Sequence, residues 1–558
     1  MFRFLTQQAG DSPEPLQTQK TASAWFRQLP SVDVIGRQQH VMRAFDALRR
    51  SPKPVEFDHV AAVEFLDAKL DADRGQLITQ YVETVDGSGA LADRIWLAAY
   101  EISQGFIVAY RTLLDEAIAQ ANDARWKAAI PRLIARLIHF YGTDAKLRAL
   151  RSERWISAKW VELHQLYVRA GNLGVERVPL PPSRGAVGES GRTVEQEYLS
   201  VLMTHLLNTG TVAPAEIDWA GAQVRAWSRE LGLDEAPRTA NGFVVDVGGR
   251  TGLVRRSGDE RGSTLRYLDT TPLTERLEGE IAALRRPGGG APDPAGMLNL
   301  QRARTLEKLL PVVSADVPPR VPRDPRIAVN RAVQVRTGLV RICEELAPSD
   351  TRNRAIETGA GGEQIAPHAA ATPGAPNPAP TAPMALPDEP LWRVENRSGT
   401  GLRIAASGGI GHGLALGSLV AVREPDAADW MLGAIRRVIK ARSDEVEAGV
   451  AIIATRIIAV TLHAKTQARE DMGFVVDGVD VSTIGERFDG LYVPPPSRPA
   501  KPLAAKTLVI PTSEYIAGRS LVLITGRTVY TVALRDLLEQ RHDWSWAVIE
   551  IVATAPRG

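Results

Sequence analysis

The chain of 558 residues contains one cysteine, Cys343. A single thiol cannot form an internal disulfide, and it cannot supply the ligands of a cysteine zinc site. Apolar runs are also short, because no window approaches the roughly 18 uninterrupted apolar residues of a membrane-spanning helix. The opening stretch, MFRFLTQQAGDSPEP, becomes polar after five residues, which is too early for a signal peptide. These absences predict a cytoplasmic protein without membrane insertion.

The chain also lacks a strong excess of either charge, since its net charge is only +2. A balance this small predicts neither a nucleic-acid polymer nor an anionic membrane as a partner. Apolar residues make up 44% and charged residues 24% of the sequence, which is typical of globular protein. The length favours about three or four domains, each able to bury a core.

The first half of the chain has the periodicity of helices. Residues 1–55 contain scattered prolines and predict a partly ordered arm. From 56 to 235, apolar side chains recur every three or four positions, which is typical of amphipathic helices. One such set comprises Ile95, Ala99, Ile102, Phe106, Ala109 and Leu113, and another comprises Trp126, Ile130, Ile134, Leu137 and Tyr141. We therefore expect an all-α domain, built as an antiparallel bundle or as stacked helix pairs.

Short β-rich runs replace this pattern near residue 240. Residues 236–311 predict a small β-rich module with helices, and the chain beyond residue 312 is mostly strand-like. An Ala/Pro tract at 366–389 has almost no large apolar side chains, so we expect a disordered or extended insertion. The remaining strands divide into domains at 312–455 and 456–558. The predicted fold class is multidomain α+β, with a helical N-terminal region, a small α/β or β module, a small barrel and a C-terminal β-rich region.

Signals for catalysis are weak throughout the sequence. VVDVGGRTG, at 244–252, resembles the phosphate loop of actin-like ATPases, but Thr251 comes one residue early and an ordinary Gly-rich hairpin explains the run better. GGIGHG, at 408–413, has no βαβ unit after it, which a dinucleotide-binding loop requires. The nine histidines show no metal-ligand spacing. We expect no enzyme activity, no metal and no cofactor, and an actin-like hydrolase using Asp246 is the weaker alternative.

One group of residues points to a ligand. NRSGTG lies between two strand-like runs and contains the pattern N-x-S-x-x-G. A proline-rich segment with three arginines precedes it, and a Gly-Val pair follows it in a later strand. In order along the chain, these residues are Arg320, Arg323 and Arg326, then Asn396, Ser398 and Gly401, and finally Gly449 and Val450. In this order they resemble the PilZ domain, a small β-barrel that is a bacterial receptor for cyclic di-GMP. The resemblance covers roughly 318–455.

The family resemblance implies a function and a site. It implies a non-catalytic effector that binds cyclic di-GMP through Arg320, Arg323, Arg326 and the N-x-S-x-x-G residues. It also implies a link to surface attachment, biofilm formation, type IV pili or other motility, with a protein partner on the helical region. The family has an R-x-x-x-R pair, whereas here the arginines are three residues apart and position 322 is proline. A scaffold protein with a degenerate, non-binding barrel is therefore the alternative from another class.

The chemistry of the ligand suits these residue types. Guanidinium groups bind phosphate oxygens in a bidentate manner and match the O6/N7 edge of guanine. The amide of Asn396 can both donate to and accept from a guanine edge. Ser398 can donate to a phosphate or stabilise the turn, and Gly401 permits close approach of the backbone.

Overall fold

The computed structural model describes residues 14–85, 89–181, 191–258, 260–286, 294–316, 324–346, 356–358, 365–367, 392–407, 414–442, 445–465, 484–495, 505–525 and 528–556. They belong to two compact units, Met1–Pro322 and Arg323–Gly558. Of the predicted insertion at 366–389, only the first two residues are described. No helix in the described ranges is both long and apolar enough to cross a membrane.

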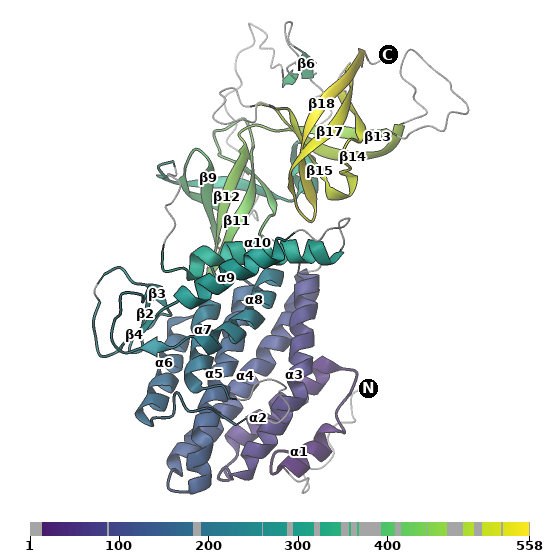
Figure 1. The fold of residues 1–558 in the computed structure, drawn as a ribbon. Helices are drawn as coiled ribbons and strands as arrows, with labels where there is room; N and C mark the ends of the chain where they lie inside the picture. The colour runs from purple at the N-terminus through teal and green to yellow at the C-terminus, as the bar shows by residue number, and fades with distance from the viewer. Residues whose placement is uncertain are drawn as a thin grey trace. The chain divides into compact units, whose positions relative to one another are not determined.

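The first unit is mainly helical (Figure 1). Its long helices pack side by side around one continuous apolar core, in which α4 contacts both α3 and α5. The helices are α1 (Gln19–Phe26), α2 (Val34–Arg50), α3 (Asp58–Thr84), α4 (Gly89–Ala119), α5 (Ala124–Leu150), α6 (Ser157–Asn172), α7 (Val194–Leu207) and α8 (Pro214–Trp227), followed by the short 3-10 helix η1 (Ser228–Glu230).

Aromatic rings pack against one another in this core. The rings of Phe106 and Phe140 stack with centroids 4.7 Å apart, and Phe45 of α2 meets Phe106 edge-on at 4.9 Å. Such pairs stabilise a core beyond the area that they bury. The segment expected to be a partly ordered arm contributes α1 and α2, and both are packed into the core, through Ala22 and Phe45 respectively.

A small sheet completes the first unit. Its strand order is β1-β4-β2-β3, and β2 and β3 form an antiparallel hairpin. The loop between them passes so close to α6 that a Cβ on Gly252 would lie 2.4 Å from the Trp160 ring, so only glycine fits there. The elements are β1 (Leu233–Asp234), β2 (Phe243–Asp246), β3 (Val254–Arg255), β4 (Leu265–Leu268), α9 (Thr271–Leu284) and α10 (Pro294–Val313).

The second unit contains two closed six-stranded barrels and the helix α11 (Leu339–Leu346). The first barrel has the cyclic strand order β10-β11-β12-β9-β8-β5, and the second has the order β13-β14-β15-β18-β17-β16. A separate two-stranded sheet pairs β6 (Ile356–Thr358) with β7 (Ile365–Pro367). The barrel strands are β5 (Ile327–Thr337), β8 (Trp392–Arg397), β9 (Gly401–Ser407), β10 (Leu419–Arg423), β11 (Met431–Arg442), β12 (Glu445–Ala454), β13 (Ile458–Lys465), β14 (Ile484–Val493), β15 (Thr507–Pro511), β16 (Ser520–Thr525), β17 (Thr528–Gln540) and β18 (Trp544–Pro556), and the 3-10 helix η3 (Thr512–Glu514) follows β15.

Each barrel has its own interior, and a third apolar core lies between the barrels. Strand alternation sends every second side chain inward, so Val420 and Val422 of β10 face the first barrel's interior. The outward neighbours Leu419 and Ala421 join the third core with α11 and the second barrel. Within the second unit the two barrels are therefore packed together. The helical N-terminal region, the small sheet module and the barrels confirm the predicted multidomain α+β fold class.

Candidate functional site

The N-x-S-x-x-G residues form the turn between β8 and β9. The backbone N–H of Ser398 donates to the carbonyl of Gly401 at 2.8 Å, and the Ser398 hydroxyl lies 3.4 Å from the same oxygen. The carbonyl of Thr400 accepts from the N–H of Ile452 at 3.0 Å, which ties the turn to the end of β12. The turn is thus held in one position at one end of the first barrel.

The start of β5 lies beside this turn. In the β5–β8 ladder, Ile327 pairs with Arg397 and Ala328 pairs with Asn396. Arg326 directly precedes Ile327, is exposed, and has no ion-pair partner among the described residues. The barrel register therefore brings one predicted arginine next to the predicted turn, although about 70 residues separate them in the chain. Arg320 and Arg323 lie outside the described residues.

The segment before β5 also touches the turn at Gly399. A Cβ on that glycine would lie 2.6 Å from Oδ2 of Asp324, so the carboxylate lies directly over the turn. Any larger residue at position 399 would have to displace Asp324. The contact supports a close approach of the arginine segment to the turn, and it adds one negative charge there.

Asn396 belongs to a row of outward-facing residues that the sequence did not reveal as a unit. It pairs with Ala328 on β5 and with Arg403 on β9, and Arg403 pairs in turn with Gly449 on β12. Among the described residues, no hydrogen-bond partner occupies the side-chain amide of Asn396. The row therefore presents a free amide beside a guanidinium.

Arg403 is fixed in place by two carboxylates. Its Nε lies 2.7 Å from Glu395, and its Nη2 lies 2.7 Å from Glu447. The side chain is 41% exposed, so these ion pairs are partly screened by solvent. The alternation of GLRIAA could have predicted that Arg403 lies on the outer face, but not that it lies beside Asn396.

A backbone irregularity accompanies the site. β5 has a bulge between Ala328 and Arg331, within which Asn330 has φ of 49°. This left-handed conformation is uncommon outside glycine, and bulges often redirect side chains next to functional sites. Arg331 lies 3.9 Å from Glu424, and Arg397 lies 3.3 Å from the same carboxylate. Two further arginines thus lie near the turn with a shared counter-ion.

The structure does not favour chemistry at Asp246. Its carboxylate accepts from the N–H of Gly248 at 3.0 Å, as in a local Asx turn of the β2–β3 hairpin. The described residues contain no group of three or more side chains that could hold a metal ion. The pairing of β2 with β3 confirms the hairpin that the ordinary interpretation of VVDVGGRTG predicted.

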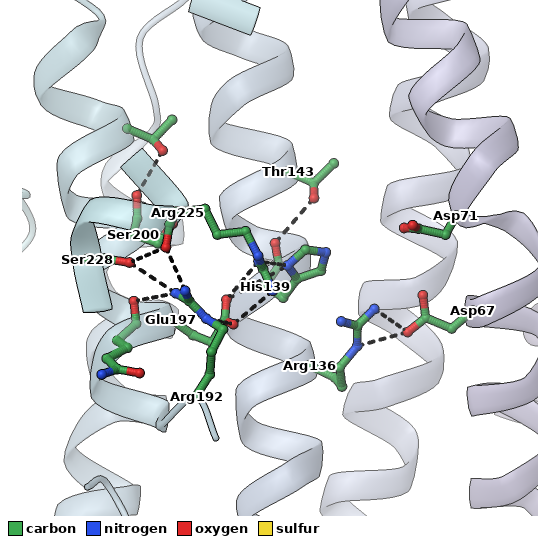
Figure 2. Close-up of polar contacts among 12 residues, drawn as sticks. Asp67, Asp71, Arg136, His139, Thr143, Arg192, Glu197, Ser200, Arg225 and Ser228 are labelled. Carbon is green, nitrogen blue, oxygen red and sulfur yellow. Dashed lines mark hydrogen bonds and ion pairs between the residues drawn. The ribbon is translucent and has the colours of Figure 1, made fainter. Parts of the chain in front are cut away.

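Charged groups of another kind lie inside the helical unit (Figure 2). Asp67 of α3 accepts from Arg74 at 2.8 Å, from Tyr110 at 2.7 Å, and from Nε and Nη2 of Arg136 at 2.9 and 2.5 Å. Burial by itself raises the pKa of a carboxyl, but the two guanidinium groups and the hydroxyl outweigh it, so the pKa of Asp67 falls to about 2. Asp67 is therefore an ionised anchor between α3, α4 and α5.

A second buried anchor joins α5, α7 and α8 (Figure 2). Glu197 accepts from Arg192 at 2.6 Å and from Arg225 at 3.0 Å. Burial opposes its charge, but the guanidiniums of Arg225 and Arg192 hold its pKa well below the ordinary value. Burial and the nearby arginines lower the pKa of His139 to about 4, so its neutral ring accepts from Arg225 at 2.6 Å. Glu197, Arg192, Arg225 and His139 thus pair with one another, which is typical of structural ion pairs.

Most of the helical unit is similar to a known protein family. Residues 20–238 match the family described as the N-terminal domain of the cyclic-di-GMP receptor FimW, a span that includes α2 to α8 and both buried anchors. No curated protein and no solved structure matches the chain. The match covers less than half of the sequence, and the barrels lie outside it. The helical part of this chain is thus similar to the N-terminal domain of a cyclic-di-GMP receptor.

Proposed function

We propose that the chain is a non-catalytic, cytoplasmic effector that binds cyclic di-GMP on its first barrel. The observation that carries the proposal is the β5–β8 register, which sets Arg326 beside the turn of Asn396, Ser398 and Gly401. The family match to the helical unit supports it independently, because that family is described as part of a cyclic-di-GMP receptor. Two parts of the chain thus point to one ligand.

The site offers the groups that a guanine dinucleotide requires. Arg326 is an exposed cation at the turn, and the other two arginines of its segment, Arg320 and Arg323, would supply further charge for two phosphates. Asn396 provides a half-buried amide for a guanine edge. The ordered turn would form the fixed wall of the site, and the arginine segment would close over the ligand.

The helical unit would pass the signal to a protein partner. Effectors of this kind act on surface attachment, type IV pili, motility or exopolysaccharide, and we propose an output in that class. A scaffold whose barrel binds no nucleotide is the alternative. It is favoured by the carboxylates near the site, since Glu424 pairs with Arg331 and Arg397 and Asp324 adds a further negative charge beside the turn.

Calorimetric titration of the full chain with cyclic di-GMP tests the proposal. We expect saturable heat, with cyclic di-AMP as the control for guanine recognition, because adenine lacks the O6 acceptor that an arginine fork requires. The absence of heat at high micromolar concentration would favour the scaffold.

The proposal also predicts the absence of turnover. We expect no hydrolysis of ATP, GTP or cyclic di-GMP, since Asp246 is engaged in its own hairpin and no acid/base pair is evident in the described site. A phosphate-release assay on the wild type and Asp246→Ala checks this. Steady ATP hydrolysis that disappears in the variant would establish the actin-like alternative instead.

A further inference from the structure

The two barrels share one strand connectivity. If β5, β8, β9, β10, β11 and β12 are matched in chain order to β13 through β18, every neighbouring pair of the first barrel has its counterpart in the second. All these pairs are antiparallel. The C-terminal barrel is therefore a second copy of the same architecture, although the two sequences show no repeat.

The match can be followed residue by residue across the candidate ligand face. On the first barrel, the outward row that contains the site runs across β5, β8, β9 and β12. On the second barrel, the corresponding row runs across β13, β14, β15 and β18. The first row is Ala328, Asn396, Arg403 and Gly449, and the second is Ala459, Leu491, Val509 and Trp546. In both barrels the next pair toward the rim contains a leucine of the barrel interior, Leu402 paired with Arg397 in one and Leu508 paired with Tyr492 in the other.

The two rows differ in chemistry and exposure at their two central positions. Asn396 is half-buried and Arg403 is 41% exposed, whereas Leu491 and Val509 are fully buried. The residues that cover the second row come from α11, which supplies Leu339, Ile342 and Cys343 to the core between the barrels. Trp430 and Leu432 of the first barrel join the same core.

We infer that the C-terminal barrel is a copy of the ligand barrel whose corresponding face has become the docking surface for α11 and the first barrel. The chain then has one face for the dinucleotide rather than two. The statement about the ligand rests on the function proposed above, whereas the docking surface stands on the core contacts alone.

Polar contacts reinforce this docking at its edge. The indole N–H of Trp544 donates to the carbonyl of Gly417 at 2.9 Å, and Arg436 binds both oxygens of Glu539 at 2.5 Å. A bidentate arginine pair fixes orientation as well as distance. Gly338, with φ of 82°, makes the turn that leads β5 into α11, so the strand that begins at the arginine segment ends at the docked helix.

The single cysteine provides a test in the full chain. Cys343 is buried in the core between the barrels, and burial raises the pKa of its thiol to about 12, so maleimide should label it slowly. Val509→Arg places a charge in the docking surface, and we expect labelling at least about tenfold faster as α11 leaves its site. Val552→Arg, on an exposed position of β18, is the matched control and should label like the wild type. Equal labelling of the two variants would overturn the inference.

Two further measurements separate the possible failures. Val509→Thr keeps the size of the side chain, so the barrel folds, and an intermediate labelling rate is expected; an unchanged rate would count against the docking role. Calorimetry on the Arg326→Ala/Asn396→Ala double variant should show no remaining site. Saturable binding of undiminished affinity there, with a binding wild type, would mean that the dinucleotide binds away from this turn, and it would refute the inference of one ligand face on the first barrel. A wild type that binds nothing would instead refute the proposed function and leave the labelling result to decide the docking.

Discussion

Replacing Asp67 with alanine should destabilise the helical unit by about 3–5 kcal/mol, the usual cost of removing one partner from a buried ion pair. Asp67 is 3% exposed and neutralises Arg74 and Arg136 in the middle of the bundle. The variant would leave two guanidiniums without this carboxylate. Hydrogen exchange of the α4 and α5 amides in the full chain measures the loss where it occurs, because unfolding of a multidomain chain is not a single transition.

Asp71 provides a matched control on the same helix. It also pairs with Arg74, at 2.9 Å, but its side chain is 73% exposed. Asp71→Ala should therefore change exchange by at most about 1 kcal/mol, as for other exposed ion pairs. Similar effects of the two substitutions would mean that burial does not govern this network.

The same carboxylate predicts how the helical unit responds to acid. The pKa of Asp67 is about 2 in the fold, below its ordinary value of 3.8. Its stabilising contribution is present at neutral pH and disappears as pH falls from about 4 to 2, because protonation breaks the ion pairs; the shift corresponds to roughly 2.5 kcal/mol. Asp67→Ala should lack this part of the acid sensitivity, which hydrogen exchange of the α4 and α5 amides at several pH values would detect.

Periodicity was sufficient to predict the helical unit. The sets around Phe106 and Trp126 gave the buried faces of α4 and α5, because an apolar face repeats every three or four residues. Periodicity could not predict the ion pair between Asp67 and Arg136, because these residues are 69 positions apart and meet only after the helices pack. Long-range ion pairs leave no periodic signal in a single sequence.

The barrel site was predictable in composition and only partly in arrangement. The polar turn at Asn396 and the arginines could be read from the residues, but the register that joins Arg326 to the turn depends on how β5 pairs with β8, a strand far away in the chain. Arg403 was missed because one arginine in an alternating strand looks like an ordinary exposed residue. The second barrel's shared topology was missed for a related reason: Leu491 and Val509 are apolar where Asn396 and Arg403 are polar, so no motif repeats.

Arg326→Ala should weaken cyclic di-GMP binding by roughly 1–3 kcal/mol, or about 5- to 150-fold, the range for a bidentate arginine–guanine pair. The side chain is exposed beside the turn and has no described ion-pair partner, so its loss removes a ligand contact rather than an internal one. Arg323→Ala should have an effect in the same range if both arginines clamp the ligand. Calorimetry at two salt concentrations measures these changes, and each arginine variant should also show a smaller salt dependence than the wild type.

Two variants make this result specific. Asn396→Ala should weaken binding while leaving the salt dependence nearly unchanged, because a neutral amide contributes no charge. Arg456 lies two residues before β13, near the place that Arg326 has directly before β5, and its side chain is 45% exposed beside Asp429, so Arg456→Ala removes an exposed charge from the second barrel. That control should bind like the wild type, since the matching face there is filled by α11. If Arg326→Ala and Asn396→Ala leave the titration of a binding wild type unchanged, the dinucleotide binds elsewhere and the turn at Asn396 has only a structural role.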